Sequence, residues 1–218
     1  MIFDEARRAV VATCLELAEK GYLSGTGGNI AYRIDDDHFA VTPSATDYYT
    51  MRPEDACVLR LDNLRRVAGE RPSVESRLHA YVLRAWGDCR ASIHTHQPIA
   101  SAYALLGRSL EIRHPQRQAT LGPRVVLVEY APSGTRWLAG KLRKALRPGI
   151  DAYFLRNHGV VCCGPTLGET VARVEALESA CAAFFRGAIG QRNSRGGEPS
   201  WSHVLSLLAQ SDEMEPVP

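Results

Sequence analysis

The hydrophobic positions in the first third of the chain follow the helical period and then the strand period. Residues 4–20 carry apolar side chains at helical spacing, and Gly21 follows as a stop signal. A glycine-rich turn at residues 25–28 then leads into two stretches that each have the alternation and the intervening turn of a β-hairpin. The predicted hairpin strands are residues 29–34 paired with 38–42 and residues 57–61 paired with 64–67.

Helical and extended segments are interspersed through the rest of the chain. The predicted helices are residues 75–86, 98–106 and 135–146, and the predicted strands are residues 92–96, 124–130 and 152–155. Thr166 and Glu169 have the spacing of a capping box, which predicts a long helix to about residue 186. A loop at 190–200, a short helix at 201–208 and an acidic tail are expected after it. The order of elements predicts an α/β fold, a three-layer α/β/α sandwich around a mostly antiparallel central sheet.

Composition places the chain among ordinary soluble globular proteins. Its 218 residues fit one domain, which we expect to span residues 1–218 with 191–218 as loop, short helix and tail. Apolar residues make up 45% and charged residues 23%, and no apolar run approaches the ~20 residues that cross a bilayer. The net charge of +2 favours neither nucleic acid nor a membrane as partner. Six cysteines without a CxxC pair indicate reduced thiols and a cytoplasmic protein.

Three histidines have a pattern that suits a metal ion. His94 and His96 are two apart on a predicted strand, so their imidazoles point to the same face. His158 follows another predicted strand, and three neutral imidazoles with an open position are the usual ligands of a catalytic zinc. Glu75 could add a fourth ligand or a base. Spacing alone leaves the alternative open, because two histidines on a strand can be surface residues and Asn157-His158-Gly159 is good turn chemistry.

The glycine-rich segment 25–29 could present backbone N–H groups to an anion. It has neither the glycine spacing of a dinucleotide site nor the Gly-Lys-Ser/Thr of a P-loop. A simple tight turn therefore remains the alternative for this segment.

Taken in order, these pieces resemble the class II aldolase/adducin family over roughly residues 4–186. The segments that carry the resemblance are GTGGNI at 25–30, VTPS at 41–44, RPED at 52–55, PSVE at 72–75, IHTH at 93–96, residues 130–135 and NHG at 157–159. The ordered set is far more specific than any one of its members. Within the family, the chain looks most similar to the small aldolases that cleave fuculose 1-phosphate or 5-deoxyribulose 1-phosphate.

The resemblance implies a metal-dependent lyase that cleaves a C–C bond of a hydroxy-carbonyl or sugar-phosphate substrate by a retro-aldol reaction. The metal, Zn²⁺ or else Mn²⁺, Co²⁺ or Fe²⁺, would spread the negative charge of the enediolate that C–C cleavage leaves. It would be held by His94, His96 and His158, with Glu75 as a ligand in the resting enzyme and as the base once substrate arrives. The implied substrate- and phosphate-binding residues are Gly28, Asn29, Ser44, Ala45 and Ser73. The family also implies a homotetramer with sites at subunit interfaces.

Other members of the scaffold supply the alternatives. A metal-dependent decarboxylase needs the same charge stabilisation and no aldehyde product, and dehydratases and epimerases share the fold. Adducin-type heads are non-enzymatic interaction modules of the same family. The presence of Glu75 and of the three histidines favours an enzyme over such a module.

Four positions depart from the family pattern. Ala45 stands where the family usually has glycine, and Val74 where it has a second serine. Pro115, after His114, stands where the fuculose-type aldolases carry a proton-donating tyrosine, and Gln116 stands where the dehydratases have a glutamate. An atypical or unphosphorylated substrate is therefore one expectation. His114 is a further candidate for the general acid, because an unperturbed imidazole titrates near ~6.5.

Overall fold

The computed structural model of the chain describes residues 2–23 and 27–193. Within this part of the chain the strands form a nine-stranded sheet in the order β4-β3-β2-β1-β5-β9-β8-β7-β6. Its strands are β1 (Asn29–Arg33), β2 (His38–Val41), β3 (Cys57–Arg60), β4 (Arg66–Ala68), β5 (Ala91–Thr95), β6 (Leu110–Glu111), β7 (Arg124–Val128), β8 (Ala152–Leu155) and β9 (Gly159–Gly164). Neighbouring strands pair antiparallel except β7 and β8, which are parallel. The prediction of a mixed α/β fold with a mostly antiparallel sheet is confirmed.

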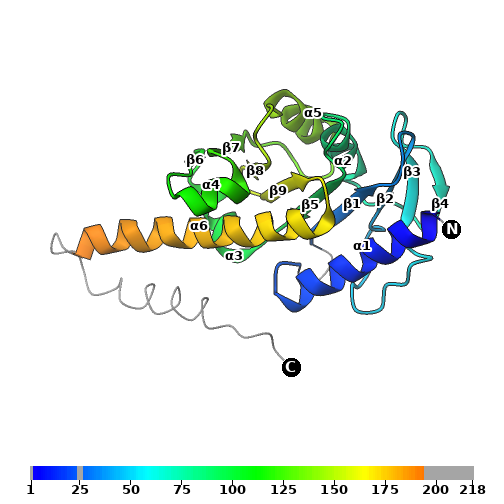
Figure 1. Cartoon of the computed structure of the whole chain (residues 1–218), viewed down its shortest axis with the longest axis horizontal. Coiled ribbons are helices and arrows are strands. Elements are labelled where there is room, and N and C mark those ends of the chain that lie inside the picture. The colour runs from blue at the N-terminus through cyan, green and yellow to red at the C-terminus, as the bar shows by residue number, and fades with distance from the viewer. Residues whose placement is uncertain (1, 24–26, 194–218) are drawn as a thin grey trace.

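Helices cover both faces of this sheet (Figure 1). They are α1 (Ile2–Glu19), α2 (Ser76–Leu83), α3 (Pro98–Leu105), α4 (Pro115–Leu121), α5 (Arg136–Ala145) and α6 (Leu167–Asn193). Successive strand residues enter different apolar cores: in β1, Ile30 packs into one core and Ala31 into the other. The first core includes side chains of α1, α3, α4 and α6, and the second includes side chains of α2 and α5.

Two sequence signals set the helix starts as expected. The Thr166 hydroxyl accepts the backbone N–H of Glu169 at 3.1 Å, as in a capping box, and α6 begins at Leu167. The Thr135 hydroxyl accepts the N–H of Leu138 at 3.2 Å at the start of α5.

Several elements differ from the sequence prediction. β9 was not among the predicted strands; its residues are all buried between β5 and β8, so its apolar run shows no alternation. The short strand β6 and the helix α4 were not expected either; α4 is polar, and of its seven residues Leu121 is the buried one. α6 continues to residue 193, so residues 190–193 are helical where a loop was expected. The rest of that loop, the helix expected at 201–208 and the tail lie outside the described residues.

The middle of the sheet positions the histidines. β5 lies between β1 and β9, with His94 opposite Asn29 on one side and Val161 on the other. The turn that joins β8 to β9 carries His158, whose backbone N–H donates to the Leu155 carbonyl at 3.0 Å. This turn lies beside the carboxyl end of β5, so residues 66 positions apart, such as His94 and Val160, meet there.

Candidate metal centre

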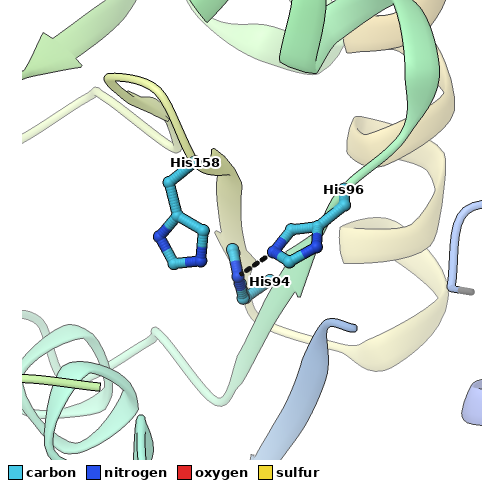
Figure 2. A group of neighbouring side chains, drawn as sticks. All are labelled: His94, His96 and His158. Atoms are coloured by element: carbon cyan, nitrogen blue, oxygen red, sulfur yellow. Dashed lines mark hydrogen bonds between the residues drawn. The ribbon is translucent and has the colours of Figure 1, made fainter. Parts of the chain in front are cut away.

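Three imidazoles converge where β5 and the β8–β9 turn meet (Figure 2). One ligand nitrogen from each of His94, His96 and His158 lies within 4.8 Å of the others. Gly159 makes this approach possible: a Cβ there would lie 2.5 Å from the Thr95 carbonyl oxygen and 2.7 Å from His96 Cδ2. The predicted convergence of the histidines is thus present in the structure.

The orientation of His94 leaves a nitrogen lone pair facing the centre. Its Nδ1 lies 2.7 Å from the Val160 carbonyl oxygen, which can only accept, so Nδ1 carries the proton. Nε2 of His94 then points at Nε2 of His96, 2.9 Å away (Figure 2). A backbone carbonyl that fixes the tautomer in this way is typical of histidines that bind metals.

Burial keeps these imidazoles neutral. It lowers the pKa of His94 and of His96 below the usual range, and the positive charge of a neighbouring imidazole lowers each further, while Glu75 acts in the opposite direction. Burial and the charge of His94 lower the pKa of His158 to about 4 against the same opposing effect. His158 Nδ1 is buried and has no hydrogen-bond partner among the described residues. Neutral imidazoles with converging lone pairs are a donor set that fits a divalent metal ion.

Glu75 lies beside the histidines, at the residue before α2. Its Oε2 is 3.3 Å from His94 Nε2, its Oε1 is 3.6 Å from His158 Nε2, and 5% of the residue is exposed. The Asn29 amide donates to Oε2 at 2.9 Å, and the Ser133 hydroxyl donates to Oε1 at 3.1 Å. Burial alone would raise the pKa of Glu75, but the electrostatic interaction with the His94 imidazole and the Asn29 hydrogen bond outweigh it and lower that pKa to about 2. An ionised carboxylate therefore completes the donor set.

Ser133 was not singled out from the sequence as a site residue. It lies in the loop before α5, 58 residues after Glu75, and its serine type carries no signal of the contact. Only the packing of that loop against the start of α2 shows it.

The residues expected to bind phosphate lie on the segments around Glu75. An isolated bridge joins Pro43 to Pro72, which places the segment containing Ser44 beside the one containing Ser73. The Ser73 hydroxyl accepts the backbone N–H of Glu75 at 3.2 Å. Ala45 has φ of +56°, the left-handed region that favours glycine, which explains why glycine would suit this position.

Gly28, the last glycine of the glycine-rich segment, packs against the histidine strand. Gly28 has φ of +91°, and a Cβ there would lie 2.8 Å from the His94 carbonyl oxygen. The Tyr48 hydroxyl donates to the Gly28 carbonyl at 2.7 Å. The Asn29 amide contacts Glu75 and His79, so the structure places it on the carboxylate side of the site.

His114 is apart from the three convergent histidines. It is exposed at the residue before α4, and the structure does not group it with them. Its role as a general acid stays a prediction.

The sequence matches the family model described as Class II Aldolase and Adducin N-terminal domain over residues 8–185. The chain belongs to the class II aldolase and adducin family. A 5-deoxy-D-ribulose 1-phosphate aldolase of Bacillus thuringiensis is 31% identical over 219 residues, covering 99% of this chain and 94% of that protein. A 3-oxo-tetronate 4-phosphate decarboxylase of Haemophilus influenzae is 29% identical over 172 residues, which cover 77% of this chain and 80% of that protein. The solved structure of an L-fuculose 1-phosphate aldolase superposes with a TM-score of 0.77 at 27% identity. The match covers 96% of this chain and 97% of that one.

Proposed function

We propose that this chain is a divalent-metal-dependent lyase that cleaves a C–C bond of a hydroxy-carbonyl, sugar-like substrate by a retro-aldol reaction. The observation that carries the proposal is the convergence of three imidazole nitrogens within 4.8 Å of one another, next to a buried carboxylate. The likeness to sugar-phosphate aldolases, one of which aligns with 99% of this chain, supports the same reaction class.

A metal ion and the protein's own side chains would each contribute to the proposed reaction. A divalent cation held by His94, His96 and His158, with Zn²⁺ first among Mn²⁺, Co²⁺ and Fe²⁺, would act as a Lewis acid toward substrate oxygens. Glu75 is ionised and can accept a proton at a carboxylate oxygen beside the ligands. Its lowered pKa makes it a weak base, so it suits a substrate hydroxyl whose acidity is already raised. Hydrogen bonds from Asn29 and Ser133 hold the carboxylate in place for this step.

On the segments around Glu75 we propose that Gly28, Asn29, Ser44, Ala45 and Ser73 receive the end of the substrate that carries phosphate in sugar-phosphate aldolases. Ala45 carries a Cβ although its backbone conformation suits glycine. Val74 is exposed beside this segment and offers methyl groups where the family pattern has a hydroxyl. Both changes weaken the case for a phosphate and support an unphosphorylated substrate.

Decarboxylation is the second candidate reaction. The likeness to a 3-oxo-tetronate 4-phosphate decarboxylase favours it, and the same donor set would serve it. Loss of carbon dioxide leaves negative charge next to a carbonyl, as aldol cleavage does, but releases no aldehyde.

A substrate panel and one pair of variants test these proposals. The purified chain is expected to hold about one metal ion per subunit, measured by elemental analysis. It should cleave one member of a panel of ketose 1-phosphates, their unphosphorylated analogues and 3-oxo-tetronate 4-phosphate. His94→Ala should lose metal and activity, whereas His38→Ala, in β2 and outside the three-histidine group, should retain both. A wild-type chain without metal, and a His94→Ala variant that matches it, would instead support a non-enzymatic module.

The layer arrangement, the cellular location and the oligomeric state of the chain are proposals as well. We propose a three-layer α/β/α arrangement within a single domain, supported by the two apolar cores on the faces of the sheet. Among the described residues no helix is long and apolar enough to cross a membrane. All six cysteines are free and buried, which fits the cytoplasmic location that we propose. Light scattering on the purified chain tests the proposed homotetramer.

A further inference from the structure

A buried histidine that is not among the proposed metal ligands packs next to Glu75. His79 is on α2, one helical turn after Glu75, and is 0% exposed. Its Nε2 lies 2.5 Å from Asn29 Oδ1, and its Nδ1 lies 2.8 Å from Ser92 Oγ. Because the Asn29 amide nitrogen also lies 2.9 Å from Glu75 Oε2, a continuous hydrogen-bonded chain joins Ser92, through His79 and Asn29, to the carboxylate.

Each link in this chain has only one possible direction. The ionised Glu75 carboxylate accepts, so the amide nitrogen of Asn29 must face it and the amide oxygen must face His79. That oxygen also accepts, so Nε2 of His79 carries the proton. A neutral imidazole has one N–H, so Nδ1 accepts and the Ser92 hydroxyl donates to it.

The surroundings of His79 keep its ring neutral. His79 is fully buried, and burial disfavours a positive charge on its ring. Ser92 is likewise 0% exposed, and Asn29 is 7% exposed, so water does not compete for the links. Buried polar chains in which every group is satisfied are the ones that hold a single arrangement.

We propose that Ser92 and His79 are positioning residues that, acting through Asn29, fix the orientation of the Glu75 carboxylate relative to the three histidines. The proposal rests on the proposed function, in which Glu75 is a ligand or base. Ser92 and His94 are two residues apart on β5, so the first residue of this hydrogen-bonded series and a proposed metal ligand come from the same strand. The register of β5 thus sets the place of both the imidazoles and the carboxylate.

The Glu75–Asn29 pair selects the tautomer of His79, and the Ser92 hydroxyl supplies the donor that this tautomer needs at Nδ1. If the proton moved to Nδ1, the Nε2 lone pair would face the Asn29 oxygen, and the two would repel each other. The amide could relieve that repulsion by turning over, but its oxygen would then face the Glu75 carboxylate. Without the Ser92 hydroxyl, the Nδ1 lone pair loses its partner, and the ring loses the hydrogen bond that anchors it to β5.

The tautomer can be measured directly in the metal-free protein. Long-range ¹H–¹⁵N correlation spectra of histidine side chains should show His79 with a protonated Nε2 and an unprotonated Nδ1. The His79→Gln variant assigns the signal by its disappearance. A protonated Nδ1 in the wild-type protein would overturn the proposal, and this result does not depend on whether the chain is an enzyme.

Variants of Ser92 test the consequence for the carboxylate. Ser92→Ala removes the hydrogen bond that anchors the His79 ring to β5, so it should weaken Co²⁺ binding about 10-fold, since partners that orient ligands are typically worth 10–100-fold. It should lower kcat while leaving KM unchanged, and Ser92→Thr, which retains the hydroxyl, should restore the affinity and kcat.

Ser101→Ala is the matched control, because the Ser101 hydroxyl is buried without a hydrogen-bond partner among the described residues. If Ser92→Ala binds Co²⁺ as tightly as Ser101→Ala does, the positioning role is wrong. If the wild-type chain binds no metal, the proposed function fails, while the tautomer spectra still decide the directions of the hydrogen bonds that join Ser92, His79 and Asn29.

Discussion

Acidification of the metal-free protein should reveal how strongly the fold depends on a neutral His79. The folded state lowers the pKa of His79 from 6.5 to about 3, mainly by burial. Its contribution to stability is therefore complete above pH 6.5 and decreases as the pH falls toward 3, because the unfolded chain binds the proton more readily. The decrease is about 1.4 kcal/mol per pH unit, so at pH 5 about 2 kcal/mol of the free energy of unfolding is lost through this residue.

Urea unfolding at pH 8 and pH 5, in the presence of a chelator, measures this loss. His79→Gln lacks the titrating ring, so wild type should lose about 2 kcal/mol more than the variant between the two pH values. The other buried histidines are present in both proteins, and their effects cancel in the comparison. His114→Gln, which changes an exposed histidine, is the matched control. If wild type and His79→Gln lose the same free energy within about 0.5 kcal/mol, His79 is not held neutral by the fold.

Two further substitutions test the backbone around the site. Ala45→Gly should raise the free energy of unfolding by about 0.5 kcal/mol, since relief of a left-handed alanine exceeds the added flexibility of the unfolded chain. The same change at the exposed helical Ala119 should lower it, and equal shifts in thermal unfolding would contradict the reasoning. Gly159→Ala should weaken metal binding at least 10-fold, because its Cβ would push against His96. Gly168→Ala, where a Cβ meets nothing within 4 Å, should bind metal like wild type in the same titration.

Local patterns predicted most of the elements, and the failures have a physical cause. The Thr166 capping box and the amphipathic α5 are set by contacts within a few residues, so the sequence shows them. β9 was missed because a strand covered on both faces is apolar throughout and loses the alternation by which strands are recognised. α4 was missed because it buries little and has no apolar face to detect.

The residue types and order of the sequence alone determined the fold class, the family and the histidines that converge, because the paired histidines share a strand face and the rest follow the family pattern. Tertiary structure decided how Glu75 is held. Its partners Asn29 and Ser133 are 46 and 58 residues away, and His79 contacts Asn29 across 50 residues. Such contacts depend on the register of β1 and β5 and on how α2 packs against them, which no local pattern specifies, so an ordinary serine and a helical histidine acquire their places only when the sheet is assembled.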